Sequence, residues 1–177
     1  TRNQVEIVRS LASQAAVAIE NARNYERIER QNRVFSRFVP TEFLSHLGRK
    51  ELAEVRLGDA VEERLVVLFA DIRAFTSLSE SLAPQEIFSF LNEYLDIIGP
   101  AISQNTGFID KYIGDAIMAL FPVSVDQAVA AAVGMLFRLA EYNTTRGRPG
   151  RPVLKIGIGI HTGLLMLGTV GGENRMD

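Results

Sequence analysis

The sequence predicts an α+β sandwich of ferredoxin-like topology (β-α-β-β-α-β) with a long helix attached at its N-terminus. Segments typical of strands and helices follow one another between residues 64 and 161 in the order strand, helix, hairpin, helix, strand. Residues 3–38 contain no proline or glycine, and their apolar or small side chains recur at spacings of three and four, which favours one continuous helix. The chain is therefore predicted to be one globular domain with a helical appendage.

The composition is that of an ordinary globular domain, with 47% hydrophobic and 23% charged residues among 177. The net charge of −2 gives no reason to expect a nucleic acid or an anionic membrane as a partner. The absence of cysteine excludes disulfides and thiolate metal sites, and no apolar run approaches the length of a membrane span. We expect a cytoplasmic protein without a membrane span.

The long helix carries an apolar seam that changes phase near Tyr25. The first part of the seam consists of Val8, Leu11, Ala15, Ala18, Ala22 and Tyr25. After a charged stretch it continues through Ile28, Phe35 and Phe38. The long helix favours parallel homodimerisation. Because the phase change alters the winding of a coiled coil locally, we expect it to be a point of signal transmission. A lone amphipathic helix packed on its own domain is the alternative.

A short helix and a polar connector follow. Pro40 ends the long helix, and residues 41–47 predict a short helix that Gly48 closes. His46 has no acidic or cysteine neighbour at ligand spacing and is predicted to be a surface residue. Residues 49–63 are predicted to be a polar connector with a turn at residues 58–59.

The central stretch is an apolar strand that ends in a carboxylate. Residues 64–70 have strand length, and Asp71 follows them directly. Further along, Gly114 and Asp115 separate two β-prone runs, which predicts a two-residue hairpin with Asp115 at its tip. A helix between residues 84 and 103 carries the chain across, so the strands before and after it run in the same direction. Asp71 and Asp115 are therefore expected to converge at one end of the sheet.

Two convergent carboxylates indicate a cation site. Charges about 4 Å apart repel by roughly 4 kcal/mol at an effective dielectric of 20, so the pair needs a proton or a cation between its members. Magnesium fits, because it accepts one or two carboxylates and keeps its other positions for water and phosphates. The simpler alternative is that Asp71 only caps the next helix and Asp115 only makes a turn.

The last part of the domain adds a helix, a basic loop and a strand. Residues 125–142 predict an alanine-rich helix, and residues 143–152 predict a solvated loop. Residues 153–161 alternate as a strand that ends at His161 and carries its isoleucines on one face and its glycines on the other. These glycines miss the GxGxxG pattern of a dinucleotide site.

Three segments carry a family resemblance. FADIRAFTSLSE at 69–80 and GFIDKYIGDAIMALFP at 107–122 resemble the two metal-binding motifs of the class III adenylate/guanylate cyclases. IGIGIHTG at 156–163 resembles the strand that follows in that family, and the resemblance covers residues 55–177. Residues 1–25 resemble the closing helix of a GAF sensory domain, and residues 26–54 resemble the signalling helix and transducing linker that precede many cyclase domains.

The resemblance implies an adenylate cyclase, which converts ATP to 3′,5′-cyclic AMP and pyrophosphate. Asp71 and Asp115 match the metal aspartates of the family, which hold two magnesium or manganese ions, and the backbone carbonyl of Ile72 matches a further metal contact. Lys111 matches the base-selecting position, where lysine goes with adenine. The segment whose backbone amides face the triphosphate is matched by Arg73, Ala74, Phe75 and Thr76. The family also implies active sites formed between the two subunits of a homodimer.

The chain ends before other parts of the family pattern. The asparagine that orients the ribose, the arginine that stabilises the transition state and a second base-selecting residue all lie further downstream in the family. The chain also lacks an initiator methionine, which together with this end indicates a fragment. Without those downstream residues, we expect it to bind nucleotide poorly and not to turn it over alone. A dimerisation and signal-relay module with a vestigial nucleotide site is one alternative. A guanylate cyclase is another, which Lys111 opposes.

Overall fold

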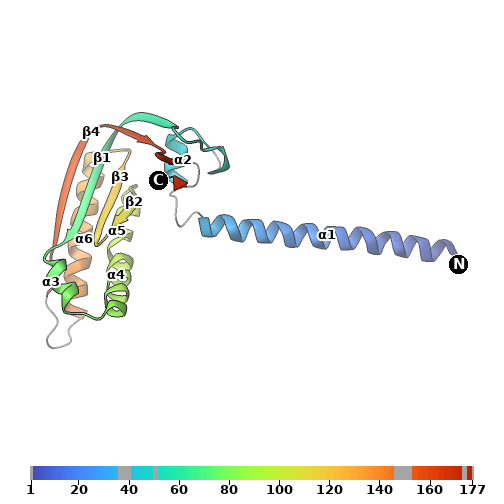
Figure 1. Ribbon diagram of the computed structural model, residues 1–177, viewed down its shortest axis with the longest axis horizontal. Helices are drawn as coiled ribbons and strands as arrows, with labels where there is room; N and C mark the ends of the chain where they lie inside the picture. The colour runs from blue at the N-terminus through green and yellow to red at the C-terminus, as the bar shows by residue number, and fades with distance from the viewer. Residues whose placement is uncertain (1, 36–40, 50–51, 146–152, 173–174, 177) are drawn as a thin grey trace. The chain divides into compact units, whose positions relative to one another are not determined.

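The computed structural model describes residues 2–35, 41–49, 52–145, 153–172 and 175–176. The chain divides into two compact units, residues 1–41 and residues 42–177. The first unit is mainly one helix, and the second holds a four-stranded sheet with helices packed against it (Figure 1).

The first unit is an exposed helix. Helix α1 (Arg2–Phe35) confirms the predicted long helix up to residue 35, and residues 36–40 lie outside the described residues. Every side chain from residue 9 to residue 32 is exposed, and the large apolar ones are Leu11, Val17, Ile19, Tyr25 and Ile28. The dimer expected from this seam stays a prediction, because exposed apolar side chains favour association without identifying the partner.

The sheet of the second unit has the predicted ferredoxin-like topology. Its strands β1 (Ala60–Ile72), β2 (Phe108–Ile113), β3 (Ala116–Phe121) and β4 (Ile156–Gly168) lie in the order β2-β3-β1-β4, and all neighbours are antiparallel. Because β1 and β2 are both antiparallel to β3, they run in the same direction, as predicted. Strand β3 lies between them, so the two parallel strands are not adjacent.

Two strands are longer than the sequence predicted. Strand β1 begins at Ala60, so the last residues of the predicted polar connector belong to the sheet. Strand β4 continues to Gly168, and His161 pairs with Val67 in mid-strand instead of ending the strand. The physical reason is that β1 and β4 pair along the full 13 residues of both strands, so even polar residues find backbone partners in the ladder.

The helices also differ from the prediction at their ends. The predicted helix between residues 84 and 103 is divided into α4 (Pro84–Ile98) and α5 (Pro100–Ser103), because Pro100 cannot donate the hydrogen bond that would continue α4. Helix α6 (Val125–Thr145) takes up the first residues of the predicted basic loop, and residues 146–152 lie outside the described residues. A short helix α3 (Phe75–Glu80) follows β1.

The main core lies between the sheet and helices α4, α5 and α6. Alternate residues of β1 are buried there, namely Val66, Leu68, Ala70 and Ile72. The isoleucines of β4 join the same core, which confirms their predicted common face. Figure 1 shows these three helices gathered on one side of the sheet. The other side of the sheet, which we call the outer face, is therefore left for other contacts.

Helix α2 (Thr41–His46) covers part of the outer face. Phe43 packs against a second apolar cluster, which includes Phe108. His46 stacks on the Phe108 ring with centroids 5.8 Å apart, and its Nδ1 lies 2.6 Å from a carboxylate oxygen of Glu63. The prediction that His46 is a surface residue is therefore wrong, because its partners come from strands distant in sequence.

The connector between α2 and β1 is tied down at a turn. It contains a short 3-10 helix, η1 (Leu52–Glu54), and the Arg49 guanidinium lies 3.1 Å from the Asp59 carboxylate. The Thr169 hydroxyl donates a hydrogen bond of 2.7 Å to the carbonyl of Arg56. Contacts from both sides therefore hold the polar connector against the end of the sheet.

A small second sheet follows β4. Strands β5 (Gly171–Gly172) and β6 (Arg175–Met176) pair antiparallel to each other. Just before them, the backbone N–H of Thr169 donates a hydrogen bond of 2.9 Å to the carbonyl of Asp59. The chain thus leaves β4 in contact with the turn that precedes β1.

The close approach of Gly168 to this turn gives a stability prediction. A Cβ at residue 168 would lie 2.7 Å from the carbonyl oxygen of Asp59 and 2.8 Å from the Cβ of Ala60. We expect Gly168→Ala to lower the free energy of unfolding by about 1–3 kcal/mol, as overpacking does, measured by urea denaturation. Gly159→Ala is the matched control in the same strand, because nothing lies within 4 Å of its added Cβ. Equal stabilities of the two variants would contradict the close approach.

Candidate functional site

The two predicted metal aspartates meet at one end of the sheet. Asp71 is the penultimate residue of β1, and Asp115 lies in the turn between β2 and β3, after a glycine with φ of 65°. Because Ala70 pairs with Ile117, the turn that contains Asp115 lies beside the end of β1. There the backbone N–H of Ile72 donates a hydrogen bond of 3.1 Å to Oδ2 of Asp115. The predicted convergence and the predicted hairpin are confirmed, and the roles of the residues stay predictions.

The two carboxyl groups, which we call the carboxylate pair, interact directly. Burial raises the pKa of Asp115, and a hydrogen bond with the Asp71 side chain and the negative charge of Asp71 raise it further. Hydrogen bonds from the backbone N–H groups of Asp115 and Ile72 lower the pKa of Asp115 and so act in the opposite direction. The ionised pair is thus costly by itself, and a shared proton or a cation relieves the repulsion.

The donor set of this site fits magnesium or manganese. Carboxylate oxygens are the ligands that these cations prefer, and magnesium needs only one or two of them when water and phosphate complete its shell. Within the described ranges, no group of three or more histidine, cysteine, aspartate or glutamate residues is placed to hold a metal ion. The carboxylate pair therefore suits a cation that shares its shell with a bound ligand, rather than a closed structural site.

The predicted phosphate-facing segment forms the turn after β1. The backbone N–H of Arg73 donates a hydrogen bond of 2.8 Å to the carbonyl of Lys155, so this amide is already engaged within the fold. Ala74 has φ of 59°, in the left-handed region, and Phe75 and Thr76 form the first turn of α3. Amides in the first turn of a helix have no acceptor within that helix. The segment thus offers amides at residues 75 and 76 rather than at residue 73.

A β-bulge sets the direction of Lys111. Ile109 pairs with Ala119, but Lys111, two residues later, pairs with Met118, so Asp110 is an extra residue in the ladder. Met118 packs with the apolar cluster of the outer face, and Lys111 opposite it lies on that face as well. Without the bulge, Asp110 would take this position.

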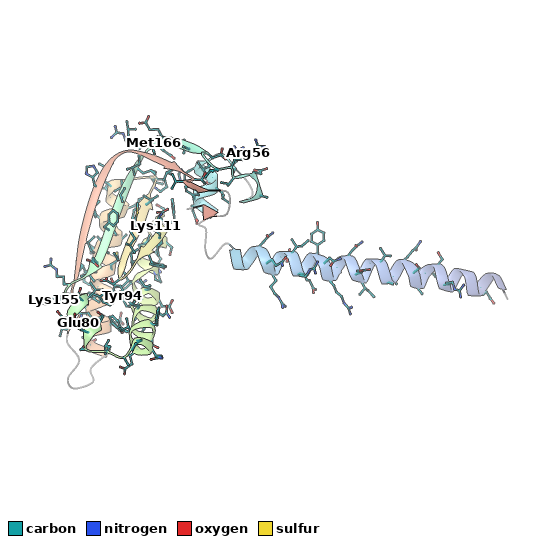
Figure 2. The ribbon with its side chains drawn as sticks, in the orientation of Figure 1. Arg56, Glu80, Tyr94, Lys111, Lys155 and Met166 are labelled. Carbon is teal, nitrogen blue, oxygen red and sulfur yellow. The ribbon has the colours of Figure 1, made fainter. Side chains whose placement is uncertain are left out.

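The outer face therefore carries both Asp71 and Lys111. Phe69 pairs with Met118 on one side and with Gly159 on the other, and Asp71 lies two residues beyond Phe69 on the same face of β1. The Phe69 side chain is 44% exposed, and nothing would contact a Cβ at Gly159. The Lys111 ammonium lies 3.9 Å from the carboxylate of the bulge residue, and 42% of the lysine side chain is exposed. Figure 2 labels Lys111 on β2.

The comparison with known proteins identifies the family. The profile described as "Adenylate and Guanylate cyclase catalytic domain" matches residues 60–177. The chain belongs to this family. Its members depend on divalent metal ions in general, which agrees with the donor set of the carboxylate pair. The family resemblance inferred from the sequence is confirmed for the cyclase domain.

Individual relatives include both adenylate and guanylate cyclases. An adenylate cyclase of Anabaena cylindrica is 43% identical over 159 residues, which cover 87% of this chain and 32% of that protein. A bacterial light-regulated adenylyl cyclase has a similar structure, with a TM-score of 0.72 and 26% identity over 86% of this chain and 45% of that one. A guanylyl cyclase structure matches with a TM-score of 0.60 and 36% identity over 66% of this chain and 62% of that one. The cyclase chain thus spans about a third of the length of its Anabaena relative.

The comparisons leave the N-terminal assignment as a prediction. The similarity to the Anabaena protein covers a larger share of the chain than residues 60–177 do, so it includes part of the segment before the cyclase domain. No GAF domain is identified by it. None of the helices in the described parts of the chain has both the length and the apolar character that a bilayer crossing requires.

The raised pKa of Asp115 gives a pH prediction. The folded state keeps a proton on Asp115 at pH values where the unfolded state, with an ordinary pKa of about 3.9, has lost it. Without metal ions, the free energy of unfolding should therefore fall as pH rises from about 4 through the raised pKa of Asp115, and then level off. Asp115→Asn should weaken this fall, measured by urea denaturation in the presence of a chelator.

Asp96→Asn is the matched control for this experiment. Asp96 is an exposed carboxylate on α4, so its replacement should leave the fall in stability in place. An identical pH profile for Asp115→Asn and the unsubstituted chain would contradict the interaction inferred for the carboxylate pair.

Proposed function

We propose that this cyclase domain converts ATP to 3′,5′-cyclic AMP and pyrophosphate. The observation that carries the proposal is the carboxylate pair, in which Asp115 accepts a hydrogen bond from the backbone at Ile72, next to Asp71. A fold that brings together the acidic groups of a strand and of a distant turn bears an electrostatic cost, which a metal-dependent reaction explains. The identity of 43% to an adenylate cyclase supports the choice of reaction.

The proposed reaction is dominated by positioning and charge. The ribose 3′-hydroxyl attacks the α-phosphorus of the same nucleotide and loses its proton, while pyrophosphate leaves. Asp71 and Asp115 would hold the divalent cations, with the carbonyl of Ile72 as a further proposed ligand. When bound, two cations at this site would supply charge that favours the deprotonated attacking oxygen and neutralises the leaving group. The amides of Phe75 and Thr76 are suited to donate hydrogen bonds to the triphosphate.

Lys111 supports ATP rather than GTP as the substrate. Its ammonium can only donate hydrogen bonds, and N1 of adenine accepts one, whereas N1 of guanine carries a hydrogen. The bulge at Asp110 turns Lys111 to the outer face, where a nucleotide has access to it. We therefore propose that Lys111 selects the base.

The same proposal includes a homodimer and an N-terminal regulatory segment. The exposed apolar side chains of α1 would be covered if two such helices paired in parallel. We propose that residues 1–25 close a GAF-type sensory domain, that residues 26–54 relay its signal, and that residues 55–177 form the catalytic domain. The nucleotide would then bind between two cyclase domains.

The test is cyclic nucleotide formation with manganese, from ATP and from GTP. The assay uses this chain and, in parallel, the full product of its gene. We expect the full gene product to form mainly cyclic AMP, and Asp71→Ala should lower this rate more than about 100-fold, because even loss of an outer partner of a metal ligand costs about 10–100-fold. Asp96→Ala, at an exposed position of α4, is the matched control and should retain the rate.

The outcomes of this assay separate the alternatives. Faster turnover of GTP than of ATP would replace the proposal by a guanylate cyclase. If the full gene product forms neither cyclic AMP nor cyclic GMP, a dimerisation and signal-relay module with a vestigial nucleotide site would be favoured.

A further inference from the structure

Tyr94 places a hydroxyl group in the core without a partner. The residue lies on α4 and is 0% exposed. Its hydroxyl has no hydrogen-bond partner among the described residues. The Tyr94 ring stacks on Phe90 with centroids 6.4 Å apart, so packing fixes its orientation. Since buried hydroxyl groups are nearly always hydrogen-bonded, this one calls for an explanation.

The Tyr94 hydroxyl experiences the charges of the carboxylate pair. Burial raises the pKa of Tyr94, and the negative charge of Asp115, followed by that of Asp71, raises it further. Ile72, whose amide holds Asp115, belongs to the same buried cluster as Tyr94. Figure 2 labels Tyr94 toward the end of the sheet where β1 is followed by α3. Tyr94 therefore lies on the helix side of the sheet, toward the end that holds the carboxylate pair.

We propose that the Tyr94 hydroxyl is a positioning group, which donates a hydrogen bond to the Asp115 carboxylate when a divalent cation is bound at the carboxylate pair. A carboxylate that holds a cation usually accepts hydrogen bonds from neighbouring groups, which fix its orientation and strengthen metal binding. Tyr94 can supply such a bond without exposure to water. The inference rests on the proposed metal site, but it concerns metal affinity rather than the reaction.

The experiment compares Tyr94→Phe with the unsubstituted chain. The substitution removes only the hydroxyl and keeps the ring in the core. The probe is Mn²⁺ alone, and its affinity is measured from the loss of the electron paramagnetic resonance signal of free Mn²⁺. We expect Tyr94→Phe to bind Mn²⁺ about tenfold more weakly, in the range found for partners of metal ligands. Without metal, its urea midpoint should be unchanged or higher, because the hydroxyl has no partner to lose.

Two control variants make the result specific. Tyr142→Phe removes the hydroxyl of another buried tyrosine of the same core, on α6, and should leave Mn²⁺ affinity unchanged. Asp115→Asn should abolish Mn²⁺ binding at the carboxylate pair, and this loss would show that the measured Mn²⁺ binds there.

The outcomes separate this inference from the proposed function. Equal Mn²⁺ affinities of Tyr94→Phe and the unsubstituted chain would overturn the role of the hydroxyl. The role would also be overturned if Asp115→Asn left Mn²⁺ binding unchanged. Weaker binding by Tyr94→Phe would support the inference even if neither ATP nor GTP is cyclised, in which case the proposed function alone would fail.

Discussion

The pairing of β1 with β3 is the interaction on which the candidate site depends. Five residue pairs, from Val66 with Phe121 to Ala70 with Ile117, set the register of the two strands. This register places the turn that contains Asp115 beside the end of β1, where the backbone N–H of Ile72 donates a hydrogen bond to Asp115. A slip by one residue would turn every side chain of β1 to the opposite face, so burial of the apolar residues fixes the position of the carboxylates.

The end of the sheet near Asp71 combines several energetic costs. The two carboxylates of the pair repel each other, Ala74 adopts a left-handed conformation, and the Tyr94 hydroxyl is buried without a partner among the described residues. Costs of this kind persist when the surrounding structure determines the geometry, and they gather at functional sites. The long β1–β4 ladder and the core beneath it supply that support. The same region is therefore well suited to bind a cation that relieves part of the cost.

Local signals explain why the elements of this site could be predicted from the sequence, whereas contacts between distant segments could not. The apolar run before Asp71 and the glycine turn before Asp115 each indicate their own structure, and the motif residues predicted the family, which the comparison confirms. By contrast, the contact of His46 with Glu63 requires the docking of α2 on the sheet. The bulge at Asp110 has no glycine or proline signal and appears only in the pairing of β2 with β3. The binding roles of the site residues stay predictions.

Whether Asp71 and Asp115 bind a cation together can be measured by anomalous diffraction at the manganese absorption edge, from crystals of the chain grown with Mn²⁺ and ATP. The structure predicts anomalous density between the carboxyl groups of Asp71 and Asp115, in contact with both. Density bound to other residues, with Asp71 and Asp115 still hydrogen-bonded to each other, would contradict the claim that their convergence forms a cation site.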